Sequence, residues 1–478
     1  MGILKNKKKI VLVIAGIVLI IACIVCGVLL INKNKIDEPS LDEIVEDKIA
    51  AYSTDLADSL ESLDSTDKVA SYLLNWAENK NISAASDENN NVIYSLKASS
   101  KDLKSVTQTV IACEYDASDM SSYIEPIALC LTVAKNTENH GAFKVIFMPR
   151  ENGEMTGADS LASKYLKDDS NVFYVGKSGS SKAAITTGGY QKLVITDKLK
   201  RTSPKYDTAY KISISGIPSQ APGTKMGQLP NAIKTLGNLL ANFKSTSLLF
   251  ELSSFSGGTS ADAIPSSANM TVVVNEADTE KLTNKLDNAI EKFNSKYAED
   301  YPELSYTYEE VKVPKKVFTK KETENIVSLM YTATNGVYNK DDDGNVTALT
   351  NIGKISTKNS KLDIELCLMS TDGELMEELH ETYKTIAGLC DVKLKLEKSY
   401  DIYSGGGKAS ALLTSFEESF LEYSGDSEMV NESAVETTPL SVFAEKNESL
   451  GMVYLAVTEK TCEKLCGSLI TFLDQGEE

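Results

Sequence analysis

The stretch VTQTVIACEYD, residues 106–116, decides how the rest of the chain is interpreted. Its first eight residues are rich in β-branched side chains and end in the apolar run Val110–Cys113, which is typical of a buried strand. Two acidic residues, Glu114 and Asp116, follow at the end of this run. A helical pattern over Tyr123–Ala134 and a second apolar, β-rich run over Ala142–Met148 come next. This alternation predicts an α/β sheet with some parallel pairing.

The composition excludes one class of partner. The chain has 478 residues, of which 42% are hydrophobic, and is long enough for two or three domains with full cores. It carries 68 acidic against 49 basic residues, a net charge of −19. Nucleic-acid binding needs a basic face, so we expect no nucleic-acid partner.

The N-terminal part has the pattern of a membrane anchor. Residues 1–9 are a basic tail, and the apolar run Ile10–Ile31 is long enough to cross about 30 Å of hydrocarbon. The positive-inside rule then places the tail in the cytoplasm and the body outside, after a stalk over residues 32–46. Cys23 ends a stretch that resembles a bacterial lipobox, which makes a lipoprotein the alternative. The apolar run continues beyond Cys23, which favours an uncleaved single-pass anchor.

The body divides into an α/β domain and an insertion. We predict the first part of the α/β domain over residues 47–205 and its second part over residues 399–478. The insertion, residues 206–398, has the β-α-β-β-α order of a ferredoxin-like sandwich. A similar order recurs within it, so the insertion is expected to be doubled. Such a unit serves as a lid or as a dimerisation module, which makes a homodimer through the lid a candidate assembly.

Several short motifs occur in a fixed order along the chain. They are Glu154-Met155-Thr156-Gly157-Ala158, Asn231-Ala232-Ile233-Lys234, Gly257-Gly258 before Ala263-Ile264-Pro265, Asn335-Gly336-Val337 and Asn351-Ile352-Gly353. In this order they resemble the co-catalytic zinc exopeptidase family, and in particular its aminoacyl-histidine dipeptidase (carnosinase-like) branch. The resemblance implies a mixed-sheet α/β domain with an inserted α+β lid, here preceded by one transmembrane helix.

The resemblance also implies a site with two zinc ions, held by two His and three carboxylates. The chain has only two histidines, His140 and His380, and neither matches a ligand position. Glu114 stands where the family has its first His, although Asp116 of that motif is retained. The positions that depart from the family's ligands are Glu114, Ser122, Asn152, Gly176 and Glu445. Lys177, beside one of them, is expected to act as an internal counter-ion in place of a metal.

Other site residues follow from the same resemblance. Glu151 corresponds to the general base, so Glu151 and Asp116 are the vestigial catalytic residues. Gln220 aligns with the substrate-polarising His of the lid. Asn335 and Asn351 are the remaining substrate-binding candidates.

Three functions fit this pattern. The first is a membrane-anchored, extracytoplasmic pseudopeptidase, a pseudoenzyme that binds a peptide-like ligand or a protein partner and needs no cofactor. The second is an active metal-dependent dipeptidase with a rebuilt carboxylate site, which would use zinc. The third is a structural surface protein. Fold alone does not choose among them.

Overall fold

The computed structural model describes residues 39–474, except residues 152, 179–181, 219–220, 224–225, 227, 426–428 and 430–432. The described residues do not include the predicted tail, the span Ile10–Ile31 or the start of the stalk. Among the residues that are described, no helix is both long and apolar enough to cross a membrane. The predicted stalk over residues 32–46 overlaps helix α2, which already begins at Leu41.

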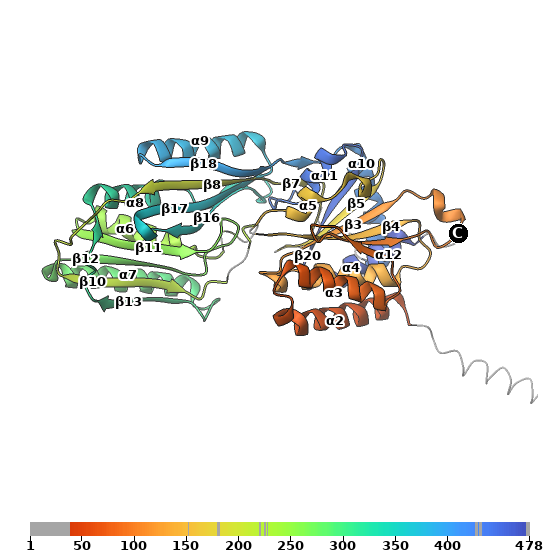
Figure 1. The fold of residues 1–478 in the computed structure, drawn as a ribbon, viewed down its shortest axis with the longest axis horizontal. Coiled ribbons are helices and arrows are strands. Elements are labelled where there is room, and N and C mark those ends of the chain that lie inside the picture. Colours follow the sequence, from red (N-terminus) through yellow and green to blue (C-terminus); the bar gives the residue numbers. More distant parts are fainter. Residues whose placement is uncertain are drawn as a thin grey trace, which may run out of the picture. The chain divides into compact units, whose positions relative to one another are not determined.

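The first sheet has seven strands in the order β1-β2-β4-β3-β5-β20-β6. Figure 1 labels four of them, β3, β4, β5 and β20. Their bounds are β1 Ala84–Ser86, β2 Val92–Leu96, β3 Thr109–Tyr115, β4 Phe143–Pro149, β5 Asn171–Lys177, β6 Lys182–Ala184 and β20 Gly451–Val457. Strands β4, β3, β5 and β20 are parallel to one another. Both faces of such strands are covered, which explains why every residue of β3 is buried. The pairing of β20 with β5 confirms that the C-terminal segment folds back onto the first unit.

The α/β domain also contains helices. They are α2 Leu41–Ser59, α3 Thr66–Asn79, α4 Ile124–Asn136, α5 Thr156–Ser160, α10 Gly407–Ser424, α11 Leu440–Lys446 and α12 Cys462–Leu473. Helices α4 and α10 both pack against α12, with α4 lying on β3 and β5 and α10 on β20. Trp76 of α3 stacks on Tyr94 of β2 with ring centroids 6.0 Å apart.

The second sheet belongs to the insertion and has nine strands. Eight of them follow the order β13-β10-β12-β11-β16-β17-β8-β18, and β15 pairs with β16 at the side. The bounds are β8 Gly189–Lys198, β10 Thr208–Ser215, β11 Phe250–Gly258, β12 Ala268–Val274, β13 Ser305–Val311, β15 Gly336–Lys340, β16 Val346–Ser356, β17 Lys361–Ser370 and β18 Lys393–Tyr400. Two short pairs, β7 Thr186–Thr187 with β19 Tyr403–Ser404 and β9 Arg201–Thr202 with β14 Val317–Phe318, complete the strands.

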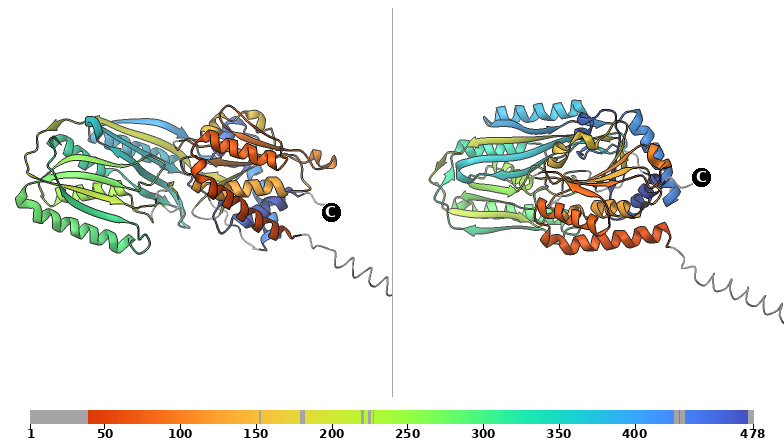
Figure 2. Two further views of the ribbon diagram at one scale, coloured as in Figure 1. Left: turned by 60° about the horizontal axis from the view of Figure 1, so that its bottom comes forward. Right: turned by 45° about the vertical axis from the view of Figure 1, so that its right-hand side comes forward.

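Four helices pack along this sheet: α6 Ala232–Ser245, α7 Thr279–Tyr297, α8 Lys320–Thr332 and α9 Gly373–Leu389. Figure 2 shows α7 (green) alongside the strands in its left view and α9 (blue) in its right view. The elements β10-α6-β11-β12-α7-β13 form one ferredoxin-like unit, because their antiparallel strands lie in the order fourth, first, third, second. The elements β8-α8-β16-β17-α9-β18 repeat that order, and the pairing of β11 with β16 joins both units into one sheet.

The doubled lid is thus confirmed, but its predicted start at residue 206 is wrong. Strand β8 lies inside the predicted first α/β segment, residues 47–205, yet it pairs with β17 and β18. It is the first strand of the second ferredoxin-like unit, and the whole first unit is inserted between it and α8. The pairing of β8 with β17 and β18 has no local signature in the sequence, because these strands follow more than 150 residues later. Local pattern therefore places β8 in the domain of the strands that precede it.

Candidate functional site

The candidate site lies at the carboxyl ends of the parallel strands, where open α/β sheets commonly bind ligands. Glu114 is the second-last residue of β3, and Arg150 directly follows β4. The strands are parallel and in register there, with Tyr115 opposite Pro149. The backbone N–H of Arg150 donates to the Tyr115 carbonyl at 2.7 Å, which holds the start of the next loop beside the end of β3.

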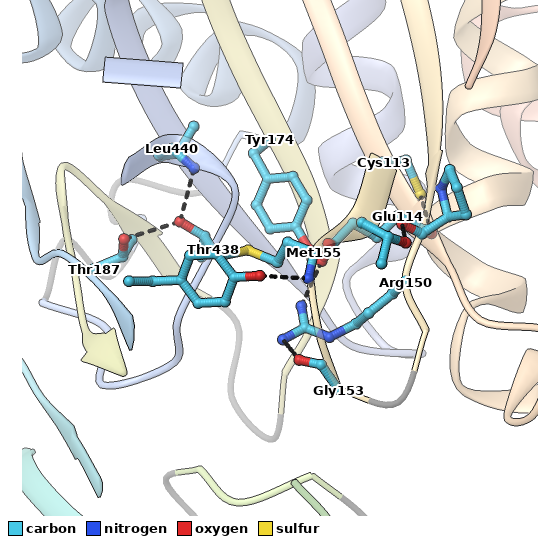
Figure 3. Close-up of polar contacts among 12 residues, drawn as sticks. Cys113, Glu114, Arg150, Gly153, Met155, Tyr174, Thr187, Thr438 and Leu440 are labelled. Carbon is cyan, nitrogen blue, oxygen red and sulfur yellow. Dashed lines mark hydrogen bonds and ion pairs between the residues drawn. The ribbon is translucent and has the colours of Figure 1, made fainter. Parts of the chain in front are cut away.

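A buried ion pair occupies this position (Figure 3). Arg150 Nη1 donates to Glu114 Oε2 at 2.8 Å, and the Tyr174 hydroxyl donates to the same oxygen at 2.9 Å. The Glu114 side chain is 1% exposed and that of Arg150 is 18% exposed. Arg150 Nη2 also donates to the Gly153 carbonyl at 3.2 Å. The second Glu114 oxygen, Oε1, is buried and has no hydrogen-bond partner among the described residues.

The electrostatics favour the charged form of Arg150. Burial by itself would lower the pKa of the guanidinium, but the negative charge of Glu114 raises that pKa well above its usual value. Burial, and then Glu114, raise the pKa of the Tyr174 hydroxyl well above its usual range. Tyr174 therefore stays protonated and acts as a hydrogen-bond donor to the carboxylate.

A second buried pair lies near the adjoining edge of the sheet. Lys182 Nζ lies 3.8 Å from Glu436 Oε2, and the Lys182 side chain is only 3% exposed. Ser178 Oγ donates to Glu436 Oε1 at 3.0 Å. Tyr454 of β20 stacks on Tyr174 at 5.4 Å between centroids, and Glu436 contributes to the raised pKa of Tyr454 after burial. Each of the stacked tyrosines therefore has a carboxylate near it, Glu114 for Tyr174 and Glu436 for Tyr454.

The insertion also contacts this region. The Tyr400 hydroxyl accepts from the backbone N–H of Met155 at 2.9 Å and donates to Asp159 Oδ2 at 3.1 Å. The carboxylate of Asp262 lies against Gly153, which has φ +81°. A β-carbon at Gly153 would stand 1.8 Å from Asp262 Oδ2, so this glycine is required for the close approach.

Most of the predicted site residues do not converge here. Asp116 Oδ1 instead accepts from the backbone N–H and the hydroxyl of Ser118, at 2.8 and 2.6 Å, and so stabilises its own turn. Glu151 is exposed and accepts from Thr66 Oγ1 at 2.7 Å. Glu445 is an exposed residue of α11.

Of the four remaining predicted positions, two are described by the structure and two are not. Ser122 is half-buried in the short 3-10 helix Met120–Ser122. Gly176 lies against the Tyr174 ring, where a β-carbon would stand 3.0 Å from the ring. Asn152 and Gln220 lie outside the described residues.

The predicted counter-ion is the wrong residue. Lys177 is 41% exposed and pairs with Glu125 at 3.2 Å, whereas Arg150 makes the buried pair with Glu114. The sequence reasoning also missed Tyr174, Lys182 and Glu436. One sequence feature could have identified Arg150, namely its position just after a predicted strand. That strand is parallel to β3, so Arg150 lies beside Glu114 at the same edge of the sheet.

The two substrate-binding asparagines belong to an internal network of the insertion. Asn231 Nδ2 donates to Asn335 Oδ1 at 3.0 Å, to Asn351 Oδ1 at 3.1 Å and to the Ile352 carbonyl at 2.9 Å. Asn351 is fully buried, and its Nδ2 donates to the Ala261 and Ala263 carbonyls. The amide of Asn351 is fully used within the protein, which favours a structural role.

Comparisons with known proteins agree with this fold. Residues 210–300 match the family model M20_dimer, the peptidase dimerisation domain. No curated protein sequence is a significant match. The solved structure of aminoacylhistidine dipeptidase from Vibrio alginolyticus has 18% identity and a TM-score of 0.60, over 88% of this chain and 96% of that one. The predicted recognition is confirmed: the chain has the fold of M20 peptidases, including aminoacylhistidine dipeptidase.

Two further solved structures match the chain more weakly. One is an M20 family metallo-carboxypeptidase from Sulfolobus solfataricus, with 12% identity, a TM-score of 0.39, and 85% and 95% of the two chains covered. The other is the Bacillus subtilis YXEP protein, described as a dinuclear metal binding peptidase, with 11% identity, a TM-score of 0.34, and 89% and 98% covered. Our expectation of no cofactor is corrected, because the likeness in fold to aminoacylhistidine dipeptidase gives no reason to exclude a metal.

The described residues at this site do not fit a dinuclear centre. Within the described ranges, no group of three or more His, Cys, Asp or Glu is close enough to hold a metal ion. Glu114, at the position of the family's first ligand, already accepts from Arg150 and Tyr174. A metal ion beside Glu114 would also face the positive charge of Arg150 at close range, which costs free energy in a buried site.

Proposed function

We propose that this chain, with the fold of aminoacylhistidine dipeptidase, is a pseudopeptidase that binds a peptide-like ligand or a protein partner without hydrolysing it. The observation that supports the proposal is the buried pair of Arg150 and Glu114. A hydrolase of this fold needs groups that activate water, and here Glu114 is engaged by a guanidinium and a phenol. Glu151, the presumed base, is exposed and hydrogen-bonded to Thr66.

The proposal includes the location of the protein. The lysine-rich start of the chain and the apolar run Ile10–Ile31 support a single-pass anchor with an extracytoplasmic body. Protease treatment of intact cells tests this part. Removal of the body is expected, and full protection of the body would refute the topology.

The alternative is an active dipeptidase, and the likeness to aminoacylhistidine dipeptidase favours it. The full-length protein in detergent should be incubated with Xaa-His dipeptides in the presence of Zn²⁺, Mn²⁺ or Co²⁺. We expect no turnover above a protein-free control containing the same metal. Turnover that disappears in Glu151→Gln, with the fold unchanged by circular dichroism, would establish the enzyme and refute the pseudopeptidase.

The match of residues 210–300 to a peptidase dimerisation domain supports a homodimer through the lid as part of the same proposal. Sedimentation velocity of the full-length protein measures the oligomeric state. A protein that remains monomeric at micromolar concentration would refute this assembly.

A further inference from the structure

A groove lies between helices α6 and α7 of the insertion, away from the residues discussed so far. Its volume is about 720 Å³. One wall is formed by Thr235, Asn238 and Asn242, which share a face of α6 because they lie three and four residues apart. Leu239 also belongs to the lining. This wall therefore presents polar side chains beside one apolar side chain.

The α7 wall has the same spacing and adds positive charge. Lys285, Asn288 and Lys292 lie on one face of α7 and line the groove. Neither lysine forms an ion pair with any residue that the structure describes, although the whole chain is strongly acidic. One lysine follows the other by two helical turns, a rise of about 10 Å along the axis.

One buried polar group of the lining lacks a partner. Tyr306 of β13 lines the groove, is 5% exposed, and its ring meets that of Phe293 edge-on at 5.3 Å. Its hydroxyl is buried and has no hydrogen-bond partner in the described part of the chain. A buried hydroxyl without a partner is unfavourable, so a ligand that accepts a hydrogen bond from it would remove that cost.

We propose that this groove binds an acidic peptide segment in an extended conformation, with two carboxylates on Lys285 and Lys292 and a peptide carbonyl on the Tyr306 hydroxyl. An extended polyproline II chain repeats its side-chain direction every three residues, which spans about 9 Å. Acidic residues three positions apart therefore match the spacing of the lysines. The amides of Asn238, Asn242 and Asn288 each offer a donor and an acceptor, as a peptide group does. This inference rests on the proposed binding function and names its ligand.

A second copy of the chain is a poorer occupant. A two-fold contact through the groove would apply the same surface to itself. It would therefore bring Lys285 and Lys292 of both copies together, and like charges at a contact are unfavourable.

Fluorescence anisotropy with the full-length protein in detergent tests the proposal. The probe is a short fluorescein-labelled peptide with two glutamates three positions apart, and its control carries glutamines in their place. We expect the acidic peptide to bind at least about tenfold more tightly than the glutamine peptide, because two charge-assisted hydrogen bonds are lost. Lys285→Gln and Lys292→Gln should each weaken binding. Lys244→Gln, an exposed lysine of α6 outside the groove, should leave it unchanged.

Tyr306→Phe separates ligand binding from folding. Because the hydroxyl has no partner, the variant should melt at the same or a higher temperature, and it should bind the acidic peptide several-fold more weakly. Equal affinity of the wild type for both peptides would overturn the proposal. So would acidic-peptide binding that persists in Lys285→Gln and Lys292→Gln, although the proposed binding function would then survive at another site. A dimer that dissociates in these two variants would overturn it in favour of a second copy.

Discussion

The guanidinium of Arg150 and the carboxylate of Glu114 lie 2.8 Å apart, from Nη1 to Oε2, at the ends of two adjacent parallel strands. The carboxylate is almost completely buried. A buried pair contributes little net free energy when it is intact, because desolvation offsets the attraction. Removing one partner is costly, because the other charge is left unpaired.

We therefore expect Arg150→Met to lower the free energy of unfolding by about 3–5 kcal/mol. The double variant Arg150→Met/Glu114→Leu should be more stable than Arg150→Met alone, since it leaves no unpaired charge. Urea denaturation of the full-length protein, followed by the fluorescence of its single tryptophan, measures both.

Lys177→Met is the matched control, because it breaks the partly exposed pair with Glu125. Its effect should stay below about 1 kcal/mol. A larger effect for Lys177→Met than for Arg150→Met would reverse our assignment of the counter-ion.

The network of three asparagines supports a second prediction. Asn351→Ala removes two hydrogen bonds to the Ala261 and Ala263 carbonyls and leaves Asn231 without one acceptor. We expect a loss of about 2–4 kcal/mol in the free energy of unfolding, from buried polar groups left unpaired. Asn294→Ala, an exposed position on α7, should change it by less than about 0.5 kcal/mol. Equal melting temperatures for both variants would show that Asn351 does not have the structural role that we assign to it.

The sequence predicts the positions of helices and strands more accurately than it predicts which strands pair. The predicted helix over Tyr123–Ala134 and the predicted strand over Ala142–Met148 follow from local periodicity, and the structure has α4 over Ile124–Asn136 and β4 over Phe143–Pro149. Strand β8 was misassigned, because its neighbours β17 and β18 follow much later in the chain. A pairing at that separation is decided by tertiary packing, which local pattern does not encode.

The candidate site shows the same limit. Glu114 was identified because the motif that contains it can be seen in one short stretch of sequence. Its partner Arg150 was not, because the pairing depends on the register of β3 with β4. Glu445 was chosen by proximity to a family position, whereas Glu436 is the acid that reaches Lys182. Which of several nearby carboxylates belongs to the site can be decided only when the burial of each is known.

The contact between Gly153 and Asp262 supports a third prediction. Gly153→Ala would place its methyl group on the Asp262 carboxylate and would strain a backbone with φ +81°. We expect a loss of about 2–4 kcal/mol, of which about 1 kcal/mol is backbone strain. Gly153→Ala in an Asp262→Ala background should recover most of the steric part, so a double-mutant cycle by urea denaturation should show strong coupling. Additive effects would mean that the two residues do not touch in solution.

The six described cysteines support a fourth prediction. All are buried and free, and burial raises the pKa of the thiols of Cys113, Cys367 and Cys466 well above the usual value. The thiolate is the reactive species, so these thiols should not react with iodoacetamide in the native protein, even at pH 9. A Cys23→Ser/Cys26→Ser background isolates the six, and mass spectrometry counts the labelled sites. Cys390, at the C-terminal end of α9, is less deeply buried and should react first.

The same shifts fix the sign of a pH effect. Above about pH 8.5 the unfolded thiols lose protons that the folded thiols retain, so the folded state binds more protons. The free energy of unfolding should therefore fall as the pH rises above that value. Cys113→Ala and Cys466→Ala each remove one such group, so they should reduce the slope of stability against pH, although each also leaves a small cavity that lowers stability at every pH. A slope unchanged in both variants would show that the thiols are not the groups responsible, and rapid labelling of all six in the native protein would contradict their burial.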